Sequence, residues 1–158
     1  MLEINPEREL KLTCSIGVIA YNEAGNIIKL LQALCDQKLI HTDIAEIIVV
    51  SSACTDGMDD LVIEFARTHP HVSLICEKER SGKSAAINIF LKEAKSDILI
   101  IESGDTIPAP DTIEKLVIPF LDSKIGATGG RPTPINDEKT LMGYAVHLLW
   151  RLHHRMAL

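Results

Sequence analysis

Two carboxylates three positions apart follow an apolar run in the stretch ILIIESGDTIP, residues 98–108. Glu102 and Asp105 offer the hard oxygen ligands that Mg²⁺ and Mn²⁺ prefer. The same pair could instead act as a general acid and base, or simply face water at the end of a strand. Spacing alone leaves these three alternatives open, so the surrounding segments have to decide between them.

A lysine at a predicted helix start is a further candidate. Ser81-Gly82-Lys83-Ser84 looks like the end of a phosphate-binding P-loop, but that motif requires glycine at position 77, where this chain has Glu. A P-loop also follows a strand directly, whereas residues 77–80 are all charged. A P-loop is therefore disfavoured. Lys83 at a helix N-terminus could still contact a phosphate, or be an ordinary solvated lysine.

Four apolar segments that alternate with amphipathic ones predict the fold. The expected strands cover residues 12–20, 44–50, 72–76 and 97–101, and each is followed by apolar residues at helical spacing. The fourth helix opens with Asp111-Thr112-Ile113-Glu114, an Asp/Glu variant of the capping box. Strict alternation predicts an α/β fold with a mostly parallel sheet and helices on both faces, similar to a Rossmann fold.

The polar residues of interest follow these predicted strands. In an open parallel sheet the ligand site lies beyond the carboxyl ends of the strands. Those ends carry Tyr21-Asn22-Glu23, Ser51-Ser52, Cys76-Glu77 and Glu102–Asp105. The two carboxylates therefore lie at the edge where this architecture places chemistry, which favours a ligand site over a solvated strand end.

Composition limits the partners and the compartment. The chain of 158 residues is 46% hydrophobic and has a net charge of −6, which fits a domain with a core and argues against nucleic-acid binding. The four cysteines form no CxxC pair, so reduced thiols in a cytoplasmic protein are expected. No run of about 18 apolar residues occurs, so no membrane-spanning segment is predicted.

The chain changes character after Gly130. A loop-like stretch precedes an amphipathic helix predicted over 139–157, and the predicted domains are 1–132 for the core and 133–158 for the C-terminal helix. The apolar face of this helix either packs on protein, including absent residues or a second copy, or lies on a membrane surface. Its end is basic, with Arg151, His153, His154 and Arg155.

Five segments together resemble the family 2 glycosyltransferases, which have the GT-A nucleotide-sugar-binding fold. They occur in the order of the family across residues 16–132, and the match depends on the ordered set rather than on one motif. The segments are IGVIAYNEAGNI (16–27), IIVVSSACTDGMDD (47–60), SGKSAAIN (81–88), SDILIIESGDTIPAPDTIEKLV (96–117) and KIGATGGRP (124–132).

The resemblance implies a donor site for a nucleotide sugar at the strand ends. In this donor site, the segment Tyr21-Asn22-Glu23 would pack against the base and ribose of the nucleotide. Residues 51–57 match the family's Asp-Asp-Gly-Ser-x-Asp-Gly loop, in which Asp56 is kept while Ser51 and Ser52 replace two acidic residues. These replacements leave the identity of the nucleotide open.

Glu102–Asp105 takes the place of the family's Asp-x-Asp motif, which holds the metal and the diphosphate. Alignment on the following Thr-Ile-Pro implies that Asp105 is the ligand of a divalent Mg or Mn ion and that Ser103 falls on the first aspartate. Glu102 would assist the nucleotide or metal through water, or instead be a packing or capping residue, because neighbouring strand side chains point apart. Lys83 completes the predicted nucleotide-sugar-binding set.

The implied reaction is inverting transfer of a sugar from a nucleotide diphosphate to an acceptor hydroxyl. The family supplies the general base from a later part of the domain, so the catalytic residue is expected in an absent C-terminal half and the isolated chain is expected to be inactive. Acceptors in the family are often lipid-linked, which would give peripheral attachment at the cytosolic membrane face; a homo-oligomer through the last helix is another option.

Two other functions stay open at this point. A non-catalytic nucleotide-binding or regulatory α/β module would have lost the site, and metal-dependent nucleotide binding distinguishes it from an enzyme. A nucleotidyltransferase would normally carry a glycine-rich, arginine-bearing loop after the first strand, and YNEAGN is not such a loop.

Overall fold

The computed structural model describes residues 11–156. Residues 11–126 form one compact unit and residues 127–156 belong to a second; the domain boundary at residue 132 stays a prediction, and its outer ends lie outside the described residues. The strands are β1 (Leu12–Ala20), β2 (Thr42–Ser51), β3 (Val72–Cys76) and β4 (Ile98–Ser103). The helices are α1 (Ile27–Cys35), α2 (Met58–Ala66), α3 (Lys83–Glu93), α4 (Thr112–Val117), the 3-10 turn η1 (Ile118–Leu121) and α5 (Leu141–Met156).

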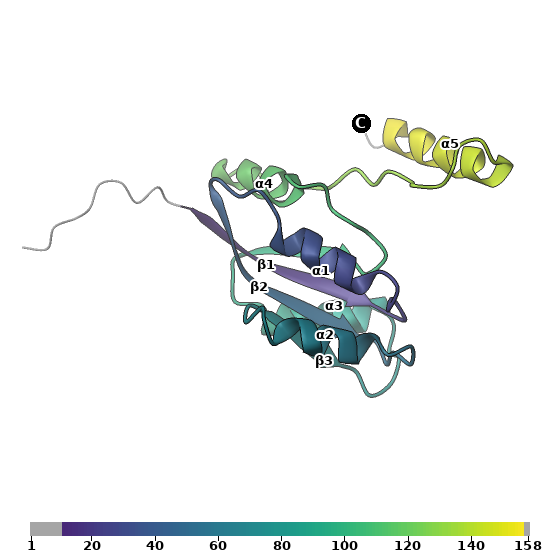
Figure 1. The fold of residues 1–158 in the computed structure, drawn as a ribbon. Coiled ribbons are helices and arrows are strands. Elements are labelled where there is room, and N and C mark those ends of the chain that lie inside the picture. The colour runs from purple at the N-terminus through teal and green to yellow at the C-terminus, as the bar shows by residue number, and fades with distance from the viewer. Residues whose placement is uncertain (1–10, 157–158) are drawn as a thin grey trace, which may run out of the picture. The chain divides into compact units, whose positions relative to one another are not determined.

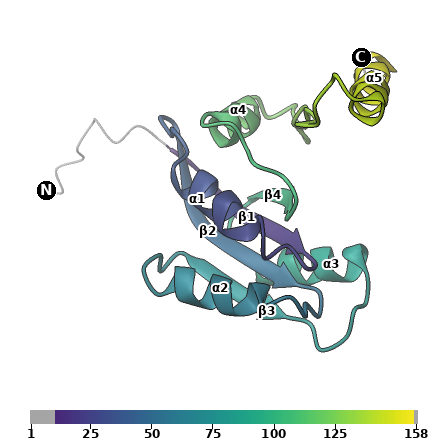
Figure 2. The ribbon, with the colours of Figure 1, turned by 45° about the vertical axis from the view of Figure 1, so that its right-hand side comes forward.

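All four strands run parallel in the order β3-β2-β1-β4, so β1 lies between β2 and β4. Figure 1 labels β1, β2 and β3, and Figure 2 also labels β4. The register pairs Ala20 with Ser51, Ser51 with Cys76 and Ile19 with Ser103. The carboxyl ends of the strands therefore meet at one edge of the sheet. A helix follows each strand, which confirms the predicted α/β fold.

One face of the sheet is covered by α1, α2 and α4. Ile16 and Val18 of β1 and Ile113 of α4 are fully buried in this larger core, because alternate residues of a strand point to the same face. The helical spacing that predicted α1 is confirmed by the buried residues Ile27, Leu30, Leu31 and Leu34.

The other face is covered by α3, which lies on the opposite side of the sheet from α1 and α2 (Figure 2). Phe90 is the largest fully buried side chain among residues 11–156, and it packs over Gly17 of β1. A Cβ on Gly17 would lie 2.4 Å from Cγ of Phe90, so only glycine fits at this position. Further out, Leu99 and Ile101 of β4 are exposed on this side.

The capping box predicted at the start of α4 is wrong. Asp111 occupies the N-cap position but makes no side-chain cap hydrogen bond. Glu114 instead accepts hydrogen bonds from the backbone N–H groups of Ile40 and His41, and Oε1 of Gln37 accepts the Ile113 N–H. The loop between α1 and β2 thus provides the hydrogen-bond partners for the first turn of α4. This is a tertiary contact, which the local sequence does not encode.

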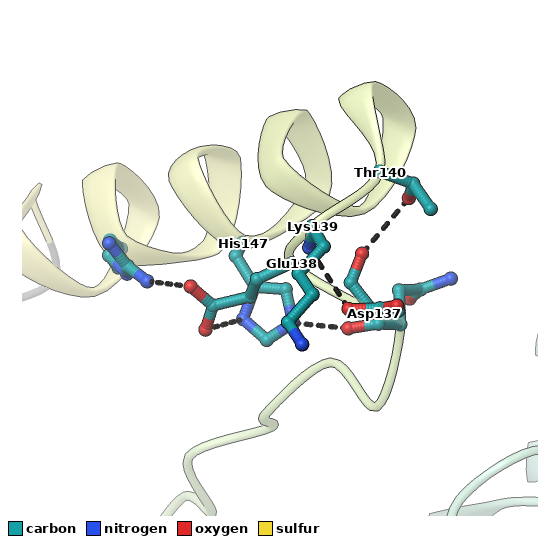
Figure 3. Close-up of polar contacts among 7 residues, drawn as sticks. Asp137, Glu138, Lys139, Thr140 and His147 are labelled. Carbon is teal, nitrogen blue, oxygen red and sulfur yellow. Dashed lines mark hydrogen bonds and ion pairs between the residues drawn. The ribbon is translucent and has the colours of Figure 1, made fainter.

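In the second unit, α5 folds back on the segment before it through its polar side. Glu138 forms an ion pair with Arg151 at 2.8 Å, and one of its carboxylate oxygens lies 3.2 Å from Nδ1 of His147. Nε2 of His147 lies 2.9 Å from the carbonyl oxygen of Asn136 (Figure 3). Among the described residues, no helix is long and apolar enough to cross a membrane.

The cysteines are free, as predicted. Burial raises the pKa of the Cys14 thiol to about 11, and burial together with a hydrogen bond to Asp59 raises the pKa of Cys76 to about 11. Both thiols are therefore protonated near neutral pH, which disfavours nucleophilic chemistry, and the buried Cys14 is part of the core.

Candidate functional site

A cleft of about 200 Å³ opens at the carboxyl edge of the sheet. Its walls come from the segments that follow β1, β2 and β4 and from the loop between β3 and α3. Five of the predicted site residues line it, namely Tyr21, Glu23, Lys83, Ser103 and Asp105. The remaining lining residues are Ile19, Ala20, Ser52, Arg80, Gly82 and Gly104.

Backbone hydrogen bonds continue the sheet one residue past the strands and fix where each loop begins. The N–H of Ser52 donates to the carbonyl of Ala20 at 3.0 Å, and the N–H of Gly104 donates to that of Ile19 at 2.9 Å. On the far side of β2, Glu77 donates to the carbonyl of Ser51 at 2.9 Å. The parallel register therefore delivers residues distant in sequence to the same cleft.

Two carboxylates meet in this cleft. Burial, and then the charges of Asp105 and Asp56, raise the pKa of the Glu23 carboxyl above its ordinary value. Glu23 and Asp105 thus form a centre of negative charge that a cation would neutralise.

Glu23 and Asp105 fit a divalent metal ion whose other ligands come from the substrate. The described residues contain no group of three His, Cys, Asp or Glu side chains that could hold an ion by themselves. Mg²⁺ is commonly held by one or two carboxylates together with substrate phosphates, rather than by a cage made only of protein. Glu23 and Asp105 supply such a partial ligand set, so the fit depends on phosphate oxygens to complete it.

Gly104 allows the two carboxylate segments to approach each other. This residue is buried, and a Cβ on it would lie 2.8 Å from the Cβ of Ala20 and 3.2 Å from Cγ of Glu23. Any side chain here would push Asp105 away from Glu23. The glycine is therefore required by close packing rather than by backbone conformation.

Basic groups also line the cleft. Lys83 begins α3 directly after Gly82, whose φ of 91° favours glycine. The guanidinium of Arg80 stacks over the ring of Tyr21 at 3.8 Å, an arrangement that leaves a cation beside an aromatic wall. Arg80 was not predicted from the sequence, although a basic residue just before a helix at this edge of the sheet is a usable signal.

Two predicted site residues brace neighbouring loops and do not line the cleft. Oδ1 and Oδ2 of Asp56 accept hydrogen bonds from the backbone N–H groups of Met58 and Ala24, at 3.1 and 2.8 Å. Oδ1 of Asn22 accepts the N–H of Thr55 at 2.9 Å, and Asn22 itself has a positive φ of 55°. The loop after β1 is thereby tied to the loop after β2.

Ser51 and Glu102 also lie outside the cleft lining. Ser51 is fully buried, and its Oγ has no hydrogen-bond partner within residues 11–156. Glu102 accepts a hydrogen bond from Oγ1 of Thr106, so its carboxylate helps to close the turn after β4. Ser52, the neighbour of Ser51, does line the cleft and donates to Oε2 of Glu77 at 2.7 Å.

The parallel sheet and its edge cleft define a domain of the GT-A type. The family model for glycosyl transferase family 2 matches residues 15–156, and this chain belongs to that family. A solved structure of the mannosyltransferase PcManGT from Pyrobaculum calidifontis, in complex with GDP-Man and Mn²⁺, superimposes with a TM-score of 0.68 at 31% identity, over 86% of this chain and 38% of that one.

Two curated relatives agree with this assignment. Glycosyltransferase AglE from Haloferax volcanii is 28% identical over 116 residues, which are 73% of this chain and 38% of the relative. Dolichyl-phosphate beta-glucosyltransferase ALG5C from Trichomonas vaginalis is 27% identical over 103 residues, which are 65% of this chain and 28% of that protein. The chain thus spans well under half of the length of these relatives.

Proposed function

We propose that the edge cleft binds a nucleotide-diphosphate sugar together with Mg²⁺ or Mn²⁺, as the donor site of an inverting glycosyltransferase that passes the sugar to an acceptor hydroxyl. The observation that carries this proposal is that Glu23 and Asp105 line one cleft together with the basic residues Lys83 and Arg80. A diphosphate bridges such a pair of charges, because its oxygens complete a metal site on one side and accept hydrogen bonds on the other.

Each part of the cleft has a role in this proposal. The ring of Tyr21, backed by Arg80, offers a flat surface for the base, and Lys83 at the start of α3 contacts a phosphate. Asp105 and Glu23 hold the metal, which when bound stabilises the charge of the leaving diphosphate. Ser103 and Ser52 offer hydroxyl groups to the sugar and the ribose. The proposal includes both GDP-sugars and UDP-sugars as donors. The GDP-Man complex of the 31%-identical mannosyltransferase favours GDP-sugars.

A thermal-shift series tests this function. We expect GDP or UDP with Mn²⁺ to raise the melting temperature, and EDTA to remove the shift, because a ligand that binds only the native state adds about 2.7 kcal/mol of stability at 100 times its Kd. ATP with Mn²⁺ serves as the control for non-specific binding to a triphosphate. A cooperatively melting chain that shows no shift with any nucleoside diphosphate would instead support the non-catalytic module.

The proposal extends to a lipid-linked acceptor and a peripheral position at the cytosolic membrane face. The side of α5 that faces away from His147 and Arg151, the residues that contact Glu138, carries an exposed apolar stripe. The last turn of α5 is basic, with His153, His154 and Arg155, and α5 contains no acidic residue. A helix that lies on the surface of an anionic membrane has such an apolar side together with basic residues. The stripe consists of Leu141, Met142, Leu148, Leu149, Leu152 and Met156.

We expect the chain to sediment with vesicles that contain phosphatidylserine and to do so less at high salt. The double substitution Leu149→Glu/Leu152→Glu should reduce this binding at least about tenfold, because it removes buried apolar area and adds repulsion. Leu61→Glu/Ile63→Glu, at exposed apolar positions on α2, is the matched control. Absence of vesicle binding, together with self-association that the α5 variant abolishes, would replace the membrane with a second copy of the chain.

A further inference from the structure

Asn26 lies between the two segments that carry the cleft carboxylates. It follows Glu23 in the turn before α1, and its backbone N–H donates to the Glu23 carbonyl at 2.9 Å. Its side chain does not cap α1. The side chain reaches instead across to the loop after β4, which is 78 residues further along the chain.

The Asn26 amide holds this loop at two points. Nδ2 donates to the carbonyl oxygen of Gly104 at 2.7 Å and lies 3.3 Å from that of Thr106. These two carbonyls flank Asp105 on either side. The two hydrogens of one amide nitrogen match the two acceptors, so the backbone around Asp105 is fixed from both sides.

The same residue thus sets the position of both carboxylates. Its backbone holds the Glu23 turn and its side chain holds the Asp105 loop. Gly104 lets this loop pack closely against Glu23, because a Cβ on Gly104 would lie 3.2 Å from Cγ of Glu23. Glu23 and Asp105 repel each other when both are ionised, so without a brace the loop would relax away from Glu23.

We infer that Asn26 is a positioning residue for the metal-nucleotide site: it holds Asp105 at the distance from Glu23 at which a divalent cation and a diphosphate bind. This inference rests on the proposed function, because it presumes that the cleft binds a cation with a nucleotide. The cation is held poorly if either carboxylate is misplaced, whereas contacts to the base do not pass through Asn26.

The test compares Asn26→Ala and Asn26→Asp with the parent chain, by titrating Mn²⁺ in the presence of GDP and, separately, of UDP. Loss of an outer partner of a metal ligand typically costs about 10–100-fold in metal affinity, so the half-saturating Mn²⁺ concentration should rise by that factor. Asn26→Asp should be the more severe variant, because a carboxylate cannot donate and adds charge beside two carbonyls. Nucleotide affinity in EDTA should stay within about twofold of the parent value.

Asn88→Ala, at an exposed position on α3, is the matched control. Unchanged Mn²⁺ dependence in both Asn26 variants would overturn the inference while the proposed function stands. An equal loss of nucleotide affinity with Mn²⁺ and with EDTA would also overturn the inference, because that pattern indicates a general structural role for Asn26. Asn26→Ser keeps a short polar side chain and replaces Asn26→Ala if the latter melts below the assay temperature. If the parent bound GDP and UDP equally well with Mn²⁺ and with EDTA, the proposed function and this inference would both be overturned.

Discussion

Asp105→Asn is expected to lower the Mn²⁺-dependent affinity for nucleotide by at least about 100-fold. Loss of a residue that only hydrogen-bonds to a metal ligand typically costs about 10–100-fold in metal affinity, and loss of the ligand itself should cost more. The substitution preserves shape and removes only the charge, and Asp105 is exposed in the cleft, so the fold should be unaffected. Isothermal titration of GDP and UDP, each with Mn²⁺ and with EDTA, measures the loss.

The matched control is Asp97→Asn, an exposed aspartate just before the amino end of β4, away from the cleft. A second measurement needs no ligand. Because the charge of Asp105 contributes to the raised pKa of Glu23, the variant should lower that pKa in an NMR titration, while the effect of burial remains. Equal nucleotide affinity in Asp105→Asn and the parent would remove Asp105 from the site.

Phe90→Ala is expected to give the largest loss of stability, about 3–5 kcal/mol in the free energy of unfolding. Phe90 is fully buried and anchors α3, the helix that brings Lys83 to the cleft, onto its face of the sheet. Urea unfolding measures the loss. Leu91→Ala, the next residue on the same helix and 45% exposed, should cost far less.

A double-mutant cycle makes this prediction specific to the contact with Gly17. Gly17→Ala alone forces a Cβ into the Phe90 ring and should cost about 1–3 kcal/mol. In the Phe90→Ala background the ring is gone, so Gly17→Ala should be nearly neutral or should stabilise the chain by filling part of the cavity. Equal costs of Gly17→Ala in both backgrounds would contradict the packing described for this face.

Most of the fold could be predicted from the sequence because the strands and helices are locally encoded. The segment 72–76 was predicted with its observed bounds, and β1 was predicted over 12–20 as observed. The strand predicted over 44–50 extends to Thr42–Ser51 in the structure, because pairing with β1 recruits flanking residues. The failure at α4 has a similar origin, since Gln37 and Glu114 satisfy backbone groups of each other's segments.

The site was less predictable because sequence does not tell which way a polar side chain at a strand end points. Asp56 and Asn22 hydrogen-bond to neighbouring loops, although their positions suggested contact with a nucleotide. Glu102 and Ser103 lie on opposite faces of β4, and only Ser103 lines the cleft. Asn26 was missed for the same reason: its partners are 78 and 80 residues away in sequence.

The most direct test of the donor site is an amide NMR spectrum of the chain with GDP and Mg²⁺, to which trace Mn²⁺ is added. Paramagnetic broadening falls off steeply with distance from the ion, so it reports where the cation binds. We predict broadening centred on the amides of Glu23, Gly104 and Asp105, and none when GDP is omitted. Broadening that centres instead on the exposed acidic residues of α2, or that is the same with and without GDP, would contradict a metal-nucleotide site in this cleft.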